Sequence, residues 1–133
     1  MRCALCEAGG ERVVWRDARC RVVLAGEPKY PAFCRVIWQA HVREMTDLDA
    51  TDREHLLGVV LAVESALRSL LAPDKVNLAS LGNQVAHLHW HVIPRFADDA
   101  HFPDAVWAGA RRPGVAHAVD EQALAAALSR LLG

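Results

Sequence analysis

One stretch of the sequence decides the fold: His87-Leu88-His89-Trp90-His91-Val92-Ile93-Pro94. Imidazoles alternate in it with large apolar side chains for three steps. Successive side chains of a β-strand point to opposite faces of its sheet, so the alternation predicts a strand with the three imidazoles on one face. Leu88, Trp90 and Val92 would then form an apolar face that can pack beneath a helix and hold the histidine row still.

The helix that could cover this face is predicted after Asp49. Apolar residues recur at helical spacing from Leu56 to Leu71, and Pro73 stops the pattern. Asp49, or Thr51 in a capping box, can cap its N-terminus. With about 22 residues the helix would be roughly 33 Å long, which is enough to cover a small sheet.

The other periodic segments are short. Strand-like apolar runs occupy residues 13–15, 20–25, 33–38, 76–81 and 88–94, and a C-terminal helix over 120–132 would begin at Asp120 and present Leu124, Leu128 and Leu131 on one face. Strands grouped around one long helix predict an α+β fold. We expect a mainly antiparallel sheet of about five strands, one long helix and one short C-terminal helix.

Length and composition fit a single domain over residues 1–133, of which 53% are hydrophobic and 23% charged, with a net charge of −1. No basic block is present, which argues against a nucleic-acid partner. The longest apolar run, Leu56 to Val63, is far too short to cross a membrane, and the N-terminus carries no apolar signal segment. We therefore expect no membrane partner and a cytoplasmic location.

Two kinds of cysteine can be distinguished. Cys20 and Cys34 lie in strand-like runs and are expected to be small buried apolar residues. Cys3 and Cys6 have the C-x-x-C spacing at which two thiolates can reach one metal ion, provided that two further ligands lie elsewhere. The histidine row offers a different metal hypothesis, because three histidines can form a catalytic zinc site.

The alternation at 87–93 also fits the pattern His-φ-His-φ-His-φ-φ, where φ is apolar, and with it the sequence resembles the histidine triad (HIT) family of nucleotide hydrolases and transferases. It is most similar to the bacterial branch described as diadenosine polyphosphate hydrolase-like. The resemblance spans a core at about residues 3–96 and leaves 97–133 as a C-terminal extension. It is supported by four further segments, which are residues 30–37, His41-Val42, Thr46-Asp47-Leu48, and Asn77 with Gly82-Asn83-Gln84-Val85.

The resemblance implies an enzyme that cleaves the α-phosphate linkage of a nucleoside monophosphate derivative, such as a dinucleoside polyphosphate or a nucleoside phosphoramidate. His89 would be the nucleophile and would form a nucleotidyl-histidine intermediate. The backbone carbonyl of His87 would hold one nitrogen of the His89 ring, and His91 would bind a phosphate or bridging oxygen and assist the leaving group.

The phosphate-binding set implied by the resemblance comprises His91, Asn77, Gly82, Asn83 and Gln84. The family usually has Gly-Gln at the position of Gly82-Asn83 and then Gln84 follows, so which of the two amides meets the phosphate is left open. Adenine is the favoured base, the chain is expected to form a homodimer, and no organic cofactor is expected.

The resemblance also completes the metal hypothesis, because some bacterial relatives bind a structural zinc through Cys-x-x-Cys and two histidines. Position by position, the ligands would be Cys3, Cys6, His41 and His87. His41 could instead only support His87 by a hydrogen bond.

Two alternative functions remain at this point: a zinc-dependent hydrolase with the histidine row as ligands, and a nucleotide-sensing binding protein with incidental turnover. Outside the row, His55, His101 and His117 are expected at the surface. Trp107 would either dock as an ordinary aromatic residue or reach the site of a partner subunit.

Overall fold

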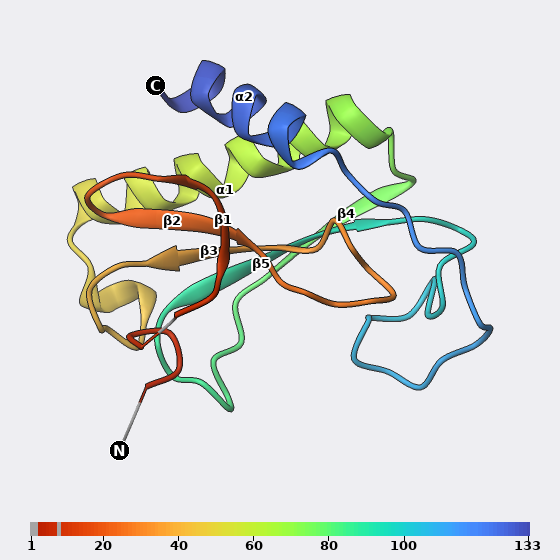
Figure 1. Ribbon diagram of the computed structural model, residues 1–133. Coiled ribbons are helices and arrows are strands. Elements are labelled where there is room, and N and C mark those ends of the chain that lie inside the picture. The colour runs from red at the N-terminus through yellow and green to blue at the C-terminus, as the bar shows by residue number, and fades with distance from the viewer. Residues whose placement is uncertain (1–2, 8) are drawn as a thin grey trace.

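Five antiparallel strands form one sheet in the order β1-β2-β3-β5-β4, and two helices pack on it (Figure 1). The computed structural model describes residues 3–7 and 9–133. The elements are β1 (Arg12–Arg16), β2 (Cys20–Leu24), β3 (Cys34–Trp38), a 3-10 turn (Met45–Asp47), α1 (Ala50–Leu71), β4 (Lys75–Ala79), β5 (His89–Arg95) and α2 (Glu121–Leu132). The predicted α+β architecture is confirmed.

Helix α1 begins and ends where local chemistry sets its bounds. The Asp49 side chain caps it by accepting a hydrogen bond from the Asp52 backbone N–H at 2.8 Å. Ala72 closes it in a left-handed conformation, with φ of 47°, immediately before Pro73. The helix buries one face against the sheet through Leu56, Val59, Val60, Ala62, Val63, Ala66 and Leu67.

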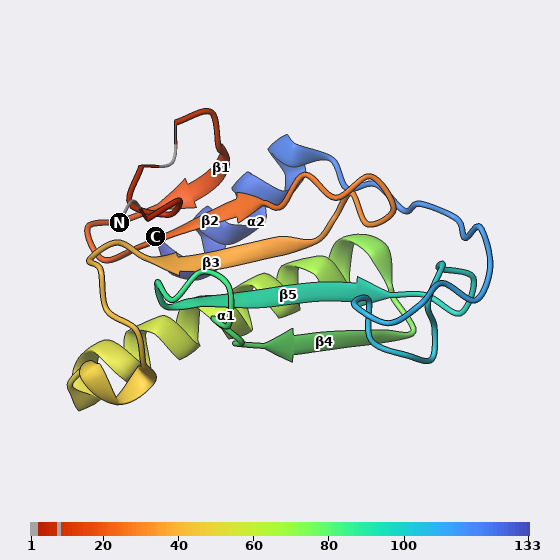
Figure 2. The ribbon, with the colours of Figure 1, turned by 90° about the horizontal axis from the view of Figure 1, so that it is seen from below.

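The main core lies between the helices and one face of the sheet. Leu88 and Val92 are buried there and Trp90 packs against them, so the predicted apolar side of the histidine stretch is confirmed. Helix α2 is capped by Asp120 and lies beside α1 and β1. Both helices lie on the same side of the sheet, as Figures 1 and 2 show.

Two details of the predicted elements are wrong. Leu131 is 53% exposed, and in the last turn of α2 it is Leu132 that packs against the core that holds Leu124 and Leu128. Strand β5 begins at His89, so His87 and Leu88 precede it. Leu88 nevertheless continues the pairing with β3, since its carbonyl accepts a hydrogen bond from the Trp38 N–H at 3.2 Å.

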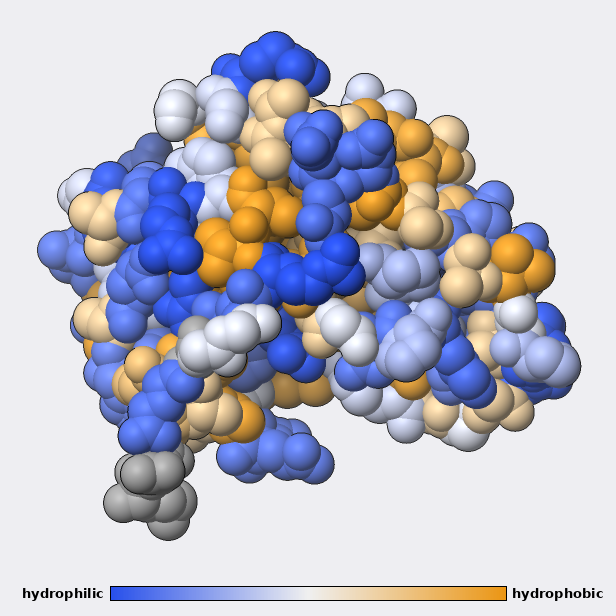
Figure 3. Space-filling view, viewed as in Figure 1, coloured by the Kyte–Doolittle hydropathy of each residue, from blue (hydrophilic) through white to orange (hydrophobic). Residues whose placement is uncertain are grey.

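The sheet face away from the helices carries a second, smaller apolar cluster of Tyr30, Phe33 and Ile93, and His89 and His91 lie on this same face. None of the helices formed by the described residues is long and apolar enough to cross a membrane. On the surface seen in Figure 3, apolar patches are interrupted by hydrophilic side chains.

Candidate active site

His89 and His91 form a pair of neighbouring rings on the open face of β5. Their ring centroids are 5.0 Å apart and nearly perpendicular, and both side chains are 7% exposed. The two-residue period of the strand places them on one face, opposite the core. Strand β3 supports them from the side, since Ile37 lies opposite His89 and Arg35 lies opposite His91 in the register.

A backbone carbonyl determines which nitrogen of His89 is available. Nδ1 of His89 lies 2.6 Å from the carbonyl oxygen of His87. A carbonyl can only accept a hydrogen bond, so Nδ1 carries the proton. In the neutral ring Nε2 therefore keeps its lone pair. This is the arrangement that a nucleophilic imidazole requires.

His91 is placed to remain uncharged. Burial lowers the pKa of His91 to about 4, and the nearby charges of His89 and Arg35 act in the same direction. Its Nδ1 is buried and has no hydrogen-bond partner among the residues that the structure describes. We assign the proton to Nε2, which makes Nε2 the donor and leaves the lone pair on Nδ1. Neutral His91 can then donate a hydrogen bond to a ligand at neutral pH.

Asn77 reaches the same face from strand β4, where it lies opposite Ile93. Its side-chain oxygen accepts a hydrogen bond from Arg95 Nη1 at 2.8 Å, which leaves its NH₂ group as the donor for a ligand. Arg95 is itself fixed by Asp99, with Nε to Oδ2 at 2.9 Å and Nη2 to Oδ1 at 3.1 Å. Burial alone would raise the pKa of Asp99, but hydrogen bonds from Arg95 and from nearby backbone N–H groups hold it well below its usual range.

The loop between β4 and β5 contains the other predicted phosphate contacts. Gly82 has φ of +73°, a conformation that favours glycine. Asn83 and Gln84 are exposed, and neither donates a hydrogen bond to the part of the chain that is described, so the choice between the two amides stays open. Ser80 ties the loop to the strand by donating from Oγ to the His89 carbonyl at 2.8 Å.

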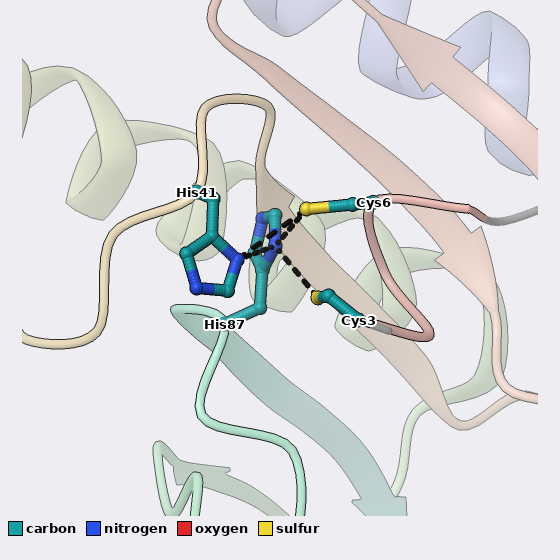
Figure 4. A group of neighbouring side chains, drawn as sticks. All are labelled: Cys3, Cys6, His41 and His87. Carbon is teal, nitrogen blue, oxygen red and sulfur yellow. Dashed lines mark hydrogen bonds between the residues drawn. The ribbon is translucent and has the colours of Figure 1, made fainter. Parts of the chain in front are cut away.

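The ring of His87 belongs to a different group of side chains, which Figure 4 shows pointing toward one another. Its Nε2 lies 2.6 Å from the Trp38 carbonyl and must donate to it, so the lone pair is on Nδ1. That Nδ1 lies 3.4 Å from Cys3 Sγ, 3.4 Å from Cys6 Sγ and 3.3 Å from His41 Nδ1. His41 Nδ1 is in turn 3.3 Å from Cys6 Sγ.

These four side chains fit a tetrahedral zinc ion. With bonds of about 2.3 Å to sulfur and about 2.0–2.1 Å to nitrogen, a tetrahedral site separates its ligand atoms by about 3.3–3.8 Å. The observed separations match these edges, and the Trp38 carbonyl fixes the ring nitrogen of His87 that must stay unprotonated. The donor set of two thiols and two imidazoles is one that zinc prefers.

The other cysteines do not have this character. Cys20 and Cys34 are fully buried, and burial raises the pKa of both thiols to about 12, as expected for small core residues. Cys20 does lie near Asp17 and His55, but Asp17 accepts hydrogen bonds from the Arg19 and Cys20 backbone N–H groups and pairs with His55. Asp17 therefore closes a turn.

The C-terminal extension contributes two rings whose positions near β5 the sequence analysis did not predict. His101 is only 9% exposed, which corrects the expected surface position, because its Nδ1 lies 2.6 Å from the buried hydroxyl of Tyr30. Trp107 packs against His91 of its own chain, with ring centroids 5.1 Å apart. His55 and His117 are only partly exposed, because each pairs with an aspartate. No sequence period connects Trp107 or His101 with β5.

Comparisons with known proteins identify one family. The profile of the HIT domain matches residues 9–98. A histidine triad protein from Bradyrhizobium japonicum is 30% identical, with a TM-score of 0.72 over 91% of this chain and 90% of that chain. One from Marinobacter aquaeolei is 29% identical, with a TM-score of 0.71 over 92% and 88%.

A zinc-bound histidine triad family protein from Mycobacterium smegmatis has the same fold at 22% identity, with a TM-score of 0.66 over 96% of this chain and 90% of that chain. No protein of curated function matches the sequence.

Proposed function

The chain belongs to the HIT domain family, and on that premise we propose that it hydrolyses or transfers a nucleoside monophosphate group through a covalent bond to His89. Family membership suggests nucleotide hydrolase or transferase activity. The observation that carries the covalent step is the contact of His89 Nδ1 with the His87 carbonyl at 2.6 Å, which leaves Nε2 free to attack.

In the first step, His89 Nε2 attacks the α-phosphorus of the substrate. A phosphorus–nitrogen bond forms as the bond to the leaving group breaks, and the bonding pair departs with that group. The positive charge that develops on the His89 ring is stabilised by its Nδ1–H donating to the His87 carbonyl. His91, neutral and donating from Nε2, hydrogen-bonds the departing atom, which takes any proton it needs from solvent.

In the second step, a water molecule attacks the same phosphorus and the phosphorus–nitrogen bond breaks. The electron pair returns to His89 Nε2, the water gives up a proton to solvent, and a nucleoside monophosphate is released. The NH₂ group of Asn77 and the loop at Gly82 are the donors proposed for the non-bridging oxygens, where the negative charge concentrates.

The finer features of the proposal follow the family resemblance. The substrates would be dinucleoside polyphosphates or nucleoside phosphoramidates. The protein would act as a homodimer in the cytoplasm, without an organic cofactor. Residues 1–133 would form one domain, with a C-terminal extension that follows the core.

We also propose a structural zinc held by Cys3, Cys6, His41 and His87. When bound, zinc would supply cross-linking of the N-terminal segment to the start of β5, and no catalytic step depends on it. The alternative of a zinc hydrolase with His87, His89 and His91 as ligands lacks support. Among the described residues these three do not come together as a metal-binding group, since His87 Nδ1 faces the cysteines.

The test is to trap the intermediate. Native protein is incubated with a nucleoside phosphoramidate labelled at the α-phosphate and quenched in base, which preserves a phosphorus–nitrogen bond. Peptide mass mapping should place an acid-sensitive label on His89. A label on any other residue would contradict the proposal. Slow turnover with tight product binding would instead support a nucleotide-sensing protein.

A further inference from the structure

A pocket with a cavity volume of about 340 Å³ adjoins the catalytic pair, His89 and His91. The proposed mechanism does not use this pocket. Its walls include Tyr30, Phe33 and Trp107. Arg35, Lys29 and Glu27 supply charge. The rings of Phe33 and Trp107 both contact the His91 ring, at centroid distances of 5.4 Å and 5.1 Å. A group bound in the pocket would therefore lie next to His91. The volume falls in the range of small-molecule sites.

Arg35 is a pocket residue with a buried hydrogen-bond donor that the described residues leave unpaired. Its guanidinium lies over the Phe33 ring, 5.9 Å from the centroid, and the described residues offer its buried Nε no hydrogen-bond partner. A buried donor left unpaired is destabilising. Arginine has donors only, so the missing partner must be an acceptor. Arg35 lies opposite His91 in the register and lines the pocket, so its terminal nitrogens, rather than the enclosed Nε, are the donors that a bound substrate would meet.

Trp107 gives the pocket a flat wall at its rim. The side chain is 53% exposed, although a ring of this size would usually be covered. Phe33 and Tyr30 lie deeper, at 3% and 7% exposure. Aromatic walls around a cavity favour a flat aromatic ring as the occupant, since such rings stack on each other in offset or edge-to-face arrangements.

The two-step chemistry indicates which half of the substrate the pocket holds. The nucleoside must stay bound while the leaving group departs and water replaces it. A walled pocket suits the retained group, whereas the departing group needs an open path. This argument rests on the proposed function.

We propose that this pocket binds a 6-oxopurine base, with Arg35 donating to its O6 and N7 atoms. Guanine and hypoxanthine both present these two acceptors, and arginine pairs with them through two parallel hydrogen bonds. Adenine presents N7 together with the N6 amino donor, which would face the guanidinium donors. Glu27 can accept from the N1–H that 6-oxopurines carry and adenine lacks. The inference replaces the expected adenine preference.

The experiment measures binding of GMP, IMP and AMP to the full-length, metal-loaded protein by calorimetry. GMP and IMP should bind at least tenfold more tightly than AMP. In Arg35→Gln this preference should disappear, and AMP should bind as tightly as GMP or more so, because glutamine pairs with the N6 and N7 atoms of adenine. Arg130→Gln, an exposed change on α2, is the matched control and should leave all three affinities unchanged.

Three results would overturn the inference: AMP binding the native protein as tightly as GMP, Arg35→Gln leaving the preference intact, or Arg35→Gln weakening all three nucleotides equally. The last would make Arg35 a phosphate ligand. Labelling of His89 distinguishes a failure of the pocket assignment from a failure of the proposed function. A labelled His89 without a base preference contradicts only the pocket assignment, whereas an unlabelled protein that binds none of the nucleotides contradicts the proposed function as well.

Discussion

At the scale of single residues, hydrogen bonds decide what each imidazole can do. His87 and His89 are two positions apart and chemically identical, yet carbonyl acceptors leave the free lone pair on Nδ1 of His87 and on Nε2 of His89. The first nitrogen faces two thiols and the second is available to a substrate. Their proposed roles therefore differ because their ring orientations differ.

Replacing the nucleophile should abolish turnover and spare the fold. His89→Asn keeps a polar side chain but cannot form the phosphorus–nitrogen bond. We expect turnover to fall by about three orders of magnitude or more, equivalent to about 4 kcal/mol, with a much smaller change in substrate binding. Steady-state kinetics and calorimetry measure the two effects. His55→Asn, on α1, is the control, and near-native turnover by His89→Asn would exclude the assignment.

His91 should make the native state sensitive to mild acid. Its pKa is lowered from 6.5 to about 4 in the folded chain, so between these values the unfolded chain binds a proton that the native state does not. Stability should therefore fall as the pH drops from 6.5 to 4, by up to about 3 kcal/mol from this group. Denaturant unfolding of native protein and of His91→Asn measures the difference.

His91→Asn should lose less free energy of unfolding than the native protein between pH 6.5 and pH 4. Both proteins contain the Cys/His cluster of Cys3, Cys6, His41 and His87, so the effects of acid on that cluster cancel in the comparison. Parallel pH profiles for the two proteins would show that His91 is not the titrating group.

At the scale of elements, strand β5 joins two sites. Its start is attached to the N-terminal segment through the Cys/His cluster, and its middle carries the catalytic pair. Pairing with β3 and the packing of Val92 under α1 hold β5 in place, and with it both sites. The rigidity of the sheet, rather than a loop, sets the position of His89.

Removing the two N-terminal thiols should remove the metal. We expect about one zinc per chain in the native protein and almost none in the double variant Cys3→Ser/Cys6→Ser, as measured by elemental analysis. The variant should also melt at a lower temperature, because zinc binds the folded state. Cys20→Ala changes a buried thiol outside the cluster and should retain the zinc. Stoichiometric metal in the double variant would remove both cysteines from the site.

At the scale of the whole molecule, we propose that the exposed side of α1 and the edge strand β4 form the interface of the expected homodimer. Leu57 and Leu61 lie one turn apart on α1 and are 40% and 56% exposed. Strand β4 lies at an edge of the sheet. Exposed apolar residues on one helix face and a free strand edge are features of homodimer interfaces.

We expect light scattering at micromolar concentration to give twice the chain mass of 14.6 kDa. Leu61→Lys should shift the equilibrium toward the monomer, because it places a charge in the proposed interface. Leu131→Lys on α2, at a similar exposure of 53%, is the matched control and should stay dimeric. A native protein with the monomer mass would contradict the dimer.

The sequence by itself determined the fold class and most element positions, because these depend on local periods and caps. The alternation around His89 set the strand, Asp49 and Pro73 bounded the long helix, and Cys3-x-x-Cys6 indicated a metal site. Only the tertiary structure decided which nitrogens are free, that Trp107 lies against His91 of its own chain, and that Arg35 Nε has no acceptor among the described residues. These features arise from contacts between segments far apart in the chain, and no local period encodes them.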